Sequence, residues 1–304
     1  MQQDKLTGYS HPLYAASFTE FGIPCYLPTC SGWILERQIP DTSYRDAMGL
    51  YPLFFCDNWE YLTDDFETLG NQLVSISLVI GPFSQFPNEK YSRYFEIFLP
   101  YKDHYILDLS LPLDETVSKG HRRSARRALK NLEVEVVVPT KSGLGDWAHL
   151  YEELVKRHQI NGIRAFSRQS FEKQMSIPGT IYFQVTHQGR VVGGNIYYLE
   201  GEVAYAHLSA FSEEGYRLGA PYAVKWFALQ HLSQLVHWVN FGGSTGSNQE
   251  HLTGLDYFKM GWSSQTGKSY FCGKILGEQK YKELVLRKQV GETNWFPAYR
   301  LGEF

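Results

Sequence analysis

The stretch TIYFQVTHQGRVVGGNIYYLEGEVAYAHLSAF, residues 180–211, decides the fold of this chain. It contains three segments that are rich in β-branched and aromatic residues, as β-strands are. These segments are 180–186, 191–199 and 202–211. The turns between them, His187-Gln188-Gly189 and Glu200-Gly201, are short and contain glycine, as turns between antiparallel neighbours do. The stretch therefore predicts a three-stranded antiparallel meander.

Helices and further strands surround the meander. After a loop at 212–220, PYAVKWFALQHLSQL predicts a helix at 221–235 that begins with a proline, and VHWVNF predicts a strand at 236–241. Upstream, helical spacing of apolar residues predicts three helices, and one strand lies among them. The helices are 114–132, 146–158 and 170–175, and the strand is 134–139. This order predicts an α/β fold, a mixed sheet with helices on both faces.

The first third of the chain is less regular. We expect strands and one helix there, and a last strand near the C-terminus. The strands are 30–39, 50–56, 73–80, 104–111 and 269–275, and the helix is 58–71. We therefore expect two domains, 1–113 and 114–304, the first of which is a degenerate copy of the second. No sequence identity between the halves is visible to prove such a duplication.

Composition limits the class of protein. The chain has 304 residues, of which 43% are hydrophobic and 20% charged, so it can bury a core. Its net charge of −3 gives no global attraction to nucleic acid. Four scattered cysteines form no metal motif, and no apolar run approaches the ~20 residues that span a bilayer. We expect a cytoplasmic protein with reduced thiols, no signal peptide, no integral membrane segment and no bound metal or cofactor.

Three stretches resemble the Fem-type branch of the GNAT acyltransferases, which comprises peptidoglycan-bridge aminoacyltransferases and related acetyltransferases. They are the basic helix KGHRRSARRALK, the strand-loop-helix segment AYAHLSAFSEEGYRLGAPYAVKWFAL, and VNFGGSTGSNQEHLTGLDYFKMGW, which has the family's Gly-Gly and Phe-Lys sequence. YFCGKILGEQKYKELV, residues 270–285, is similar to the family's ending. The resemblance covers roughly half of the chain and implies a GNAT fold, with two GNAT-like domains in tandem.

The loop before the helix at 221–235 departs from the acyl-CoA signature Gln/Arg-x-x-Gly-x-Gly/Ala. Here it is Tyr216-Arg217-Leu218-Gly219-Ala220-Pro221. This departure weakens the case for acyl-CoA and is common in Fem-type proteins, whose donor is aminoacyl-tRNA. The resemblance therefore implies aminoacyl-tRNA as donor and an amine-bearing peptide, sugar or small molecule as acceptor. An acyl-CoA-dependent transferase and a non-catalytic binding module remain as alternatives.

The same loop is a candidate donor-binding site. A glycine-containing loop that enters a helix N-terminus offers backbone N–H groups and a positive dipole end to an anion. Arg217, Gly219, Tyr222 and Lys225 are the residues that would contribute. The alternative is an ordinary connection between a strand and a helix.

The Gly-Gly and Phe-Lys segment is the candidate catalytic site. Gly242 and Gly243 let the backbone approach a reacting centre, and a fixed cation such as Lys259, packed beside Phe258, would stabilise a tetrahedral oxyanion. The resemblance implies this role for Lys259. His207, on the meander, is a candidate to accept the proton of an attacking amine. The alternatives are a solvated lysine and a structural histidine.

The helix at 114–132 carries a basic face that includes Arg122, Arg123, Arg126 and Arg127. Such a face suits an RNA backbone or another anion, although a charge run of this kind is often only solvated. Neither the oligomeric state nor the identity of the acyl group follows from the sequence.

Overall fold

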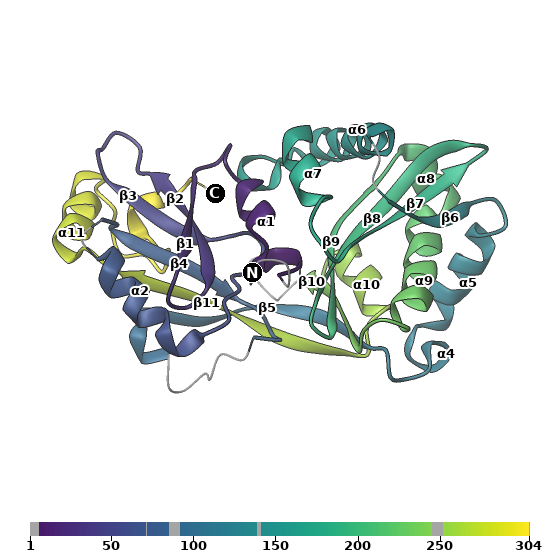
Figure 1. Cartoon of the computed structure of the whole chain (residues 1–304), viewed down its shortest axis with the longest axis horizontal. Coiled ribbons are helices and arrows are strands. Elements are labelled where there is room, and N and C mark those ends of the chain that lie inside the picture. The colour runs from purple at the N-terminus through teal and green to yellow at the C-terminus, as the bar shows by residue number, and fades with distance from the viewer. Residues whose placement is uncertain (1–5, 71, 85–91, 139–140, 245–251, 304) are drawn as a thin grey trace. The chain divides into compact units, whose positions relative to one another are not determined.

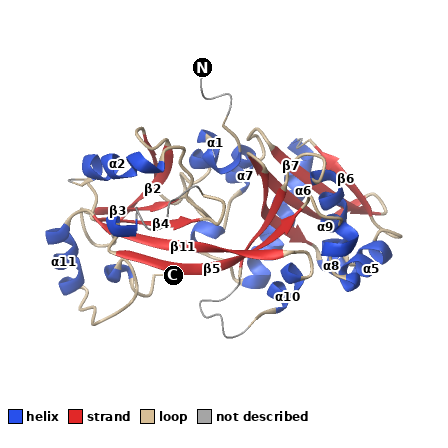
Figure 2. Ribbon diagram, turned by 90° about the horizontal axis from the view of Figure 1, so that it is seen from below, coloured by secondary structure: helices blue, strands red, loops and turns tan. Residues whose placement is uncertain are grey.

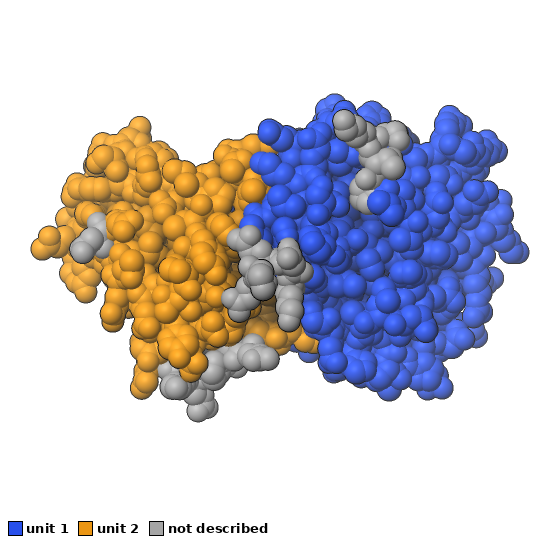
Figure 3. Space-filling model, in the orientation of Figure 1, with its two compact units in different colours: residues 1–13, 103–267 blue, residues 14–102, 268–304 orange. Residues whose placement is uncertain are grey.

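The computed structural model describes residues 6–70, 72–84, 92–138, 141–244 and 252–303. The chain forms two compact units (Figure 3). Unit 1 contains Met1–Leu13 and Asp103–Gly267, and unit 2 contains Tyr14–Lys102 and Lys268–Phe304. The boundary at residues 102 and 103 lies in strand β5 (Ile97–Asp108), and the boundary at 267 and 268 lies in β11 (Gln265–Ile275).

The residues that make up each unit differ from those of the two domains predicted on either side of residue 113. The C-terminal segment joins the N-terminal half because β11 pairs antiparallel with β4 (Ser75–Ile80), from Tyr270 opposite Ile80 to Ile275 opposite Ser75. A pairing between residues so far apart in sequence leaves no local signal. That each half is a GNAT-like domain stays a prediction.

Unit 1 contains the mixed sheet that the meander predicts. Its strand order is β5-β10-β9-β8-β7-β6 (Figure 1). The strands not yet introduced are β6 (Glu133–Val137), β7 (Thr180–His187), β8 (Arg190–Glu200), β9 (Val203–Phe211) and β10 (Trp238–Gly243). Neighbours are antiparallel from β6 to β9, β10 is parallel to β9, and β5 is antiparallel to β10. The turn between β7 and β8 has positive φ at Gln188 and Gly189, as the favoured two-residue hairpin turns require.

Helices cover both faces of this sheet (Figures 1 and 2). Tyr182 and Phe183 are successive residues of β7, so their side chains point to opposite faces. Tyr182 meets Trp147 of α6 (Lys141–His158) with ring centroids 5.7 Å apart, and Phe183 meets Phe227 of α9 (Ala220–Leu232) at 6.2 Å. The helices of unit 1 are α4 (Leu113–Thr116), α5 (Lys119–Ala128), α6 (Lys141–His158), α7 (Arg168–Gln174), α8 (Glu213–Leu218), α9 (Ala220–Leu232) and α10 (Gly254–Met260). The predicted mixed α/β class is confirmed.

Three local predictions in unit 1 are wrong. The helix expected at 114–132 breaks at Val117, which is extended, and restarts at Ser118, whose hydroxyl accepts from the backbone N–H of His121. The loop expected at 212–220 contains α8. The segment 244–264, for which no helix is predicted, contains α10, and its residues 245–251 lie outside the described residues.

Unit 2 holds the strands β1-β2-β3-β4-β11 in that order. The further elements are β1 (Ile23–Leu27), β2 (Gly32–Gln38), β3 (Arg45–Gly49), α2 (Leu62–Leu69) and α11 (Glu278–Arg287), while α1 (Pro12–Ala16) precedes β1. The strand expected at 50–56 is instead irregular, with a single bridge from Phe54 to Ile80. All four cysteines lie in or against one apolar core of unit 2, and all four are free thiols.

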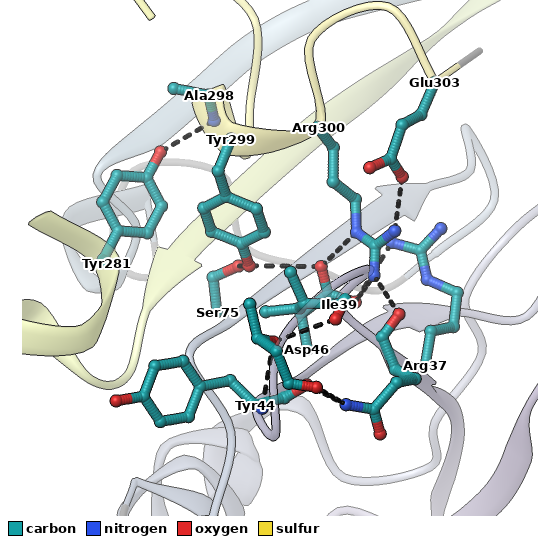
Figure 4. A network of polar contacts seen from close by, with 12 residues as sticks. Arg37, Ile39, Tyr44, Asp46, Ser75, Tyr281, Ala298, Tyr299, Arg300 and Glu303 are labelled. Carbon is teal, nitrogen blue, oxygen red and sulfur yellow. Dashed lines mark hydrogen bonds and ion pairs between the residues drawn. The ribbon is translucent and has the colours of Figure 1, made fainter. Parts of the chain in front are cut away.

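A buried ion pair fastens the C-terminal segment to this sheet (Figure 4). The Asp46 carboxylate is fully buried on β3 and accepts from Nε and Nη2 of Arg300, at 2.5 and 2.9 Å. Tyr299 donates its hydroxyl to the same carboxylate at 3.1 Å, and Arg37 donates at 3.3 Å. Tyr299 and Arg300 are therefore held by a carboxylate some 250 positions earlier in the chain.

Candidate functional site

The site begins where two parallel strands part. In the register of β9 and β10, Val203, Ala204 and Tyr205 pair with Trp238, Val239 and Asn240, and the paired register ends there. β9 continues along β8, while β10 continues along β5 through an irregularity between Asn240 and Gly243. Backbone groups of the two strands beyond Tyr205 and Asn240 are thus not used in pairing β9 with β10.

A capping box places α10 beside this point. The Thr253 hydroxyl accepts from the backbone N–H of Asp256, and the Asp256 carboxylate accepts from the backbone N–H of Thr253. The buried Asp256 also accepts from the Tyr105 hydroxyl at 3.3 Å. Burial, followed by the charge of Asp256, raises the pKa of Tyr105 to about 12, so this hydroxyl stays protonated. This hydrogen bond from Tyr105 on β5 to Asp256 on α10 connects the helix to the strand.

Lysine 259 projects from α10 onto the two glycines. Its Nζ donates to the carbonyl oxygen of Gly243 at 2.7 Å. Gly242 has φ +85°, and a Cβ built on it would lie 3.6 Å from the same Nζ. The left-handed backbone at Gly242 favours glycine and brings the chain close to the ammonium group. Lys259, Gly242 and Gly243, which the sequence analysis assigns to one candidate site, therefore lie together.

Phe258 lies in an aromatic group that supports this arrangement. Its ring is 5.1 Å from that of Tyr222 on α9 and 5.5 Å from that of His121 on α5. His121 Nε2 donates to the Phe258 carbonyl oxygen at 3.0 Å, so His121 Nδ1 accepts from the Ser118 hydroxyl at 2.8 Å. A Cβ on Gly261 would lie 2.2 Å from the His121 ring, so only glycine fits there. Tyr222 and Phe258 are packing partners here.

Lys225 is the buried lysine of α9. Its Nζ donates to the Tyr197 hydroxyl at 3.0 Å and lies 5.1 and 5.2 Å from the ring centroids of Phe241 and Tyr197. Burial, and next the positive charge of Lys259, lower the pKa of Lys225 to about 7. Near neutral pH Lys225 is therefore partly uncharged.

The α9 N-terminus offers fewer donors than the sequence implies. Gly219, with φ +80°, ends α8 and begins α9 without a loop. Its N–H is bonded to the Tyr216 carbonyl, and the N–H groups of Tyr222 and Ala223 both reach the Gly219 carbonyl. Pro221 has no N–H. Arg217 has an exposed side chain and pairs with Glu214 at 3.8 Å. This geometry does not favour a diphosphate at Gly219.

His207 is occupied on both sides. Its Nδ1 lies 3.2 Å from the Tyr9 hydroxyl, and its Nε2 lies 3.2 Å from Oε1 of Gln174. The ring stacks on Tyr198 at 4.5 Å. Burial lowers the pKa of His207 to about 3, which makes it a poor proton acceptor at neutral pH. These contacts favour the structural interpretation of His207.

The basic face of α5 is divided. Arg122 and Arg126 both donate to the Asp114 carboxylate, at 2.8 and 3.2 Å. Arg123 and Arg127 are exposed. Two arginines of the predicted basic face, Arg122 and Arg126, therefore form ion pairs within the chain.

Sequence reasoning missed one polar pair at the site. His104 on β5 and Asn240 on β10 are both buried, and His104 Nδ1 lies 3.0 Å from Asn240 Oδ1. No sequence pattern marks this pair, because 136 residues separate its members. Among the described residues, no group of three or more His, Cys, Asp or Glu side chains is arranged to hold a metal ion. In the same part of the chain, no helix is long and apolar enough to cross a membrane.

Comparison with known proteins shows a shared fold. No protein-family model matches the chain, and no curated protein matches it in sequence. Several solved structures, by contrast, match the chain in fold. A crystal structure of FemX superposes with a TM-score of 0.67 at 13% identity, covering 90% of this chain and 93% of that one. The C-terminal domain of a putative lysylphosphatidylglycerol synthetase from Agrobacterium fabrum gives 0.62 at 14% identity, with 90% and 92% covered.

A third similar structure is L-PGS from Bacillus licheniformis, with a TM-score of 0.58 at 13% identity, covering 95% of this chain and 100% of that one. The coverage is nearly complete in each case, so the likeness extends over both units. The chain therefore has the fold of FemX and of these synthetase domains, in agreement with the resemblance to the Fem-type branch. At identities this low, the likeness establishes the fold alone.

Proposed function

We propose that this protein is an N-acyltransferase that moves an aminoacyl group from aminoacyl-tRNA to an amine acceptor. The observation that carries the proposal is Lys259. Its ammonium is held at the Gly243 carbonyl, beside a left-handed glycine, where β9 and β10 part. A fixed positive charge beside accessible backbone suits the oxyanion that forms when an amine attacks an ester.

Two further features support the choice of donor. Named neighbours with this fold, FemX and lysylphosphatidylglycerol synthetase, point toward aminoacyl rather than acetyl transfer. The α9 N-terminus has its N–H groups largely engaged in α8 and in the first turn of α9, so it is poorly suited to the diphosphate of CoA. The exposed Arg123 and Arg127 would contact the tRNA backbone.

Chemistry in this site rests on positioning and charge. The attacking amine forms a bond to the ester carbonyl carbon and Lys259 stabilises the oxyanion. The bond to the tRNA 3′ oxygen then breaks, and that oxygen receives the proton that the amine gives up, so the products are an amide and a free 3′ hydroxyl. The acceptor would be a cell-wall peptide, a sugar or a small natural product that bears an amine. Acyl-CoA is the alternative donor, and a non-catalytic module is the alternative without chemistry.

The donor is tested by direct transfer. Purified protein is incubated with bulk tRNA charged with radiolabelled amino acids, or with labelled acetyl-CoA, and with a panel of amine acceptors. We expect acceptor-dependent loss of label from tRNA and formation of an alkali-stable amide. Transfer from acetyl-CoA alone would replace this proposal by the alternative donor. No transfer from either donor, with a folded protein, would favour the binding module.

A further inference from the structure

Lys225 on α9 reaches the point where β9 and β10 part. The first residues past their paired register are Ala206 on β9 and Phe241 on β10. Ala206 is the partner of Tyr197 in the pairing of β9 with β8. Lys225 Nζ donates to the Tyr197 hydroxyl at 3.0 Å and lies 5.1 Å from the centroid of the Phe241 ring. The lysine therefore contacts the β10 residue just past the parting point and the β8 residue that lies opposite β9 there.

The same stretch of β10 connects Lys225 to the lysine of the candidate site. Phe241, which packs on Lys225, is followed by Gly242, and a Cβ built on Gly242 would lie 3.6 Å from Lys259 Nζ. The positive charge of Lys259 also contributes to the lowered pKa of Lys225, second only to burial. A half-buried cation and a fully buried amine therefore lie at neighbouring residues of β10.

The surroundings of Lys225 favour its uncharged form. The side chain is buried, and the titratable groups that face it in the described part of the chain are the Tyr197 hydroxyl from β8 and Lys259 from α10. Burial raises the pKa of Tyr197, so its hydroxyl stays protonated and does not act as a counter-charge. An ammonium group that is removed from water without a carboxylate partner gives up its proton readily. The amine that results carries a lone pair and can accept a proton.

We propose that Lys225, held by the Tyr197 hydroxyl, accepts the proton of the attacking amine and passes it to the leaving oxygen. This inference rests on the function proposed above. The amine nitrogen forms a bond to the ester carbonyl carbon, Lys259 stabilises the oxyanion, and one proton moves from the amine to Lys225 Nζ. The bond between that carbon and the tRNA 3′ oxygen then breaks, and Lys225 gives the proton to this oxygen. The products are an amide and a free 3′ hydroxyl, and Lys225 is uncharged again.

The pH dependence of single-turnover transfer tests the assignment. The acceptor is a weakly basic amine such as aminoacetonitrile, so that the acceptor itself stays uncharged over the neutral range. We expect the wild-type rate to rise with pH and to level off above about pH 7, as Lys225 loses its proton. Lys225→Met should lower the rate ~10²- to 10⁴-fold, the usual contribution of a positioned base, and should remove this pH dependence.

Two further variants separate a base from a structural or purely electrostatic role. Lys225→Arg keeps the positive charge but cannot give up its proton, so it should be as slow as Lys225→Met. The matched control is Lys282→Met, a surface lysine paired with Glu278, which should keep both the wild-type rate and its pH dependence. A folded Lys225→Met or Lys225→Arg protein that transfers at the wild-type rate, or a wild-type rate that does not change with pH in this range, would overturn the proposal.

A second measurement depends neither on turnover nor on the folding of a variant. In wild-type protein with ¹⁵N-labelled lysine, the Nζ signal that contacts the Tyr197 ring should titrate near pH 7, below the ordinary lysine pKa of 10.5. Lys259→Met should raise the pKa of Lys225, because a like charge is removed. Titration of Lys225 at the ordinary lysine value in the wild type would refute the base role.

The two proposals fail differently. A wild type that transfers from no donor refutes the function itself, and the base role with it. A wild type that transfers, while a folded Lys225→Met protein remains equally active, refutes only the role of Lys225.

Discussion

The Asp46 and Arg300 pair in unit 2 allows a stability prediction to be worked out in full. Both side chains are nearly inaccessible, at 0% and 5% exposure, and four donor atoms converge on the carboxylate. Among the described residues, Asp46 is the carboxylate that Arg300 Nε and Nη2 reach, and Asp46→Ala leaves the buried guanidinium with Glu303 alone as ionic partner. Breaking a buried pair in this way costs about 3–5 kcal/mol, because the remaining charge stays removed from water and has lost its fully buried partner.

Removal of the Arg300 charge as well should recover part of the lost stability. In Asp46→Ala with Arg300→Met, the uncompensated charge of Arg300 is gone, although Arg37 still lacks its partner. We expect the double variant to be more stable than Asp46→Ala by about 1–3 kcal/mol, the usual coupling between residues in one network. Urea titration followed by circular dichroism and by tryptophan fluorescence gives each free energy of unfolding. The control is Lys282→Ala, whose pair with Glu278 is solvent-exposed and is worth less than ~1 kcal/mol.

Two results would refute this reasoning. If Asp46→Ala lost less than ~1 kcal/mol, burial of the pair would not carry the predicted penalty. If the double variant were no more stable than the single one, the loss would come from packing and not from an unpaired charge.

Three further predictions concern unit 1. Burial raises the pKa of Glu200 to about 7, above its unfolded value of 4.5. The folded state therefore keeps the carboxyl proton to higher pH than the unfolded state, and the free energy of unfolding falls as pH rises from about 4.5 through 7. Glu200→Gln should raise the melting temperature at pH 8 and not at pH 4, and an equal rise at the two pH values would contradict this prediction. Gly242→Ala and Gly201→Ala should each lower the free energy of unfolding by ~1–2 kcal/mol, because both glycines have positive φ. Only Gly242→Ala, which lies beside Lys259, should slow aminoacyl transfer, and equal transfer rates in the two variants would count against the site. Arg123→Glu with Arg127→Glu should weaken tRNA binding and lower the slope of log K against log salt by ~2, and an unchanged slope would leave α5 as a solvated face.

The meander and the Gly-Gly and Phe-Lys segment could be predicted because their signals are local. Residues 180–211 alternate and turn at Gln188-Gly189, where positive φ is required. α8 was missed because its glycines resemble a loop. Gly215 is in fact a packing position, where a Cβ would lie 2.2 Å from the Val192 carbonyl oxygen, and Ser212 caps the helix.

Tertiary contacts decided the features that the sequence could not supply. The C-terminal segment joins unit 2 through strand pairing and through Asp46, and neither contact has a local pattern. His104 and Asn240 meet only because β5 and β10 are neighbours.

The central claim, that Lys259 stabilises the transition state of aminoacyl transfer, is tested most directly by single-turnover kinetics. Wild type, Lys259→Ala and the surface control Lys282→Ala are mixed in excess with labelled aminoacyl-tRNA and a saturating amine acceptor. We predict that Lys259→Ala slows the chemical step ~10²- to 10³-fold, as loss of one oxyanion donor does, while Lys282→Ala keeps the wild-type rate. A Lys259→Ala protein that is folded, binds tRNA and transfers at the wild-type rate would contradict the account.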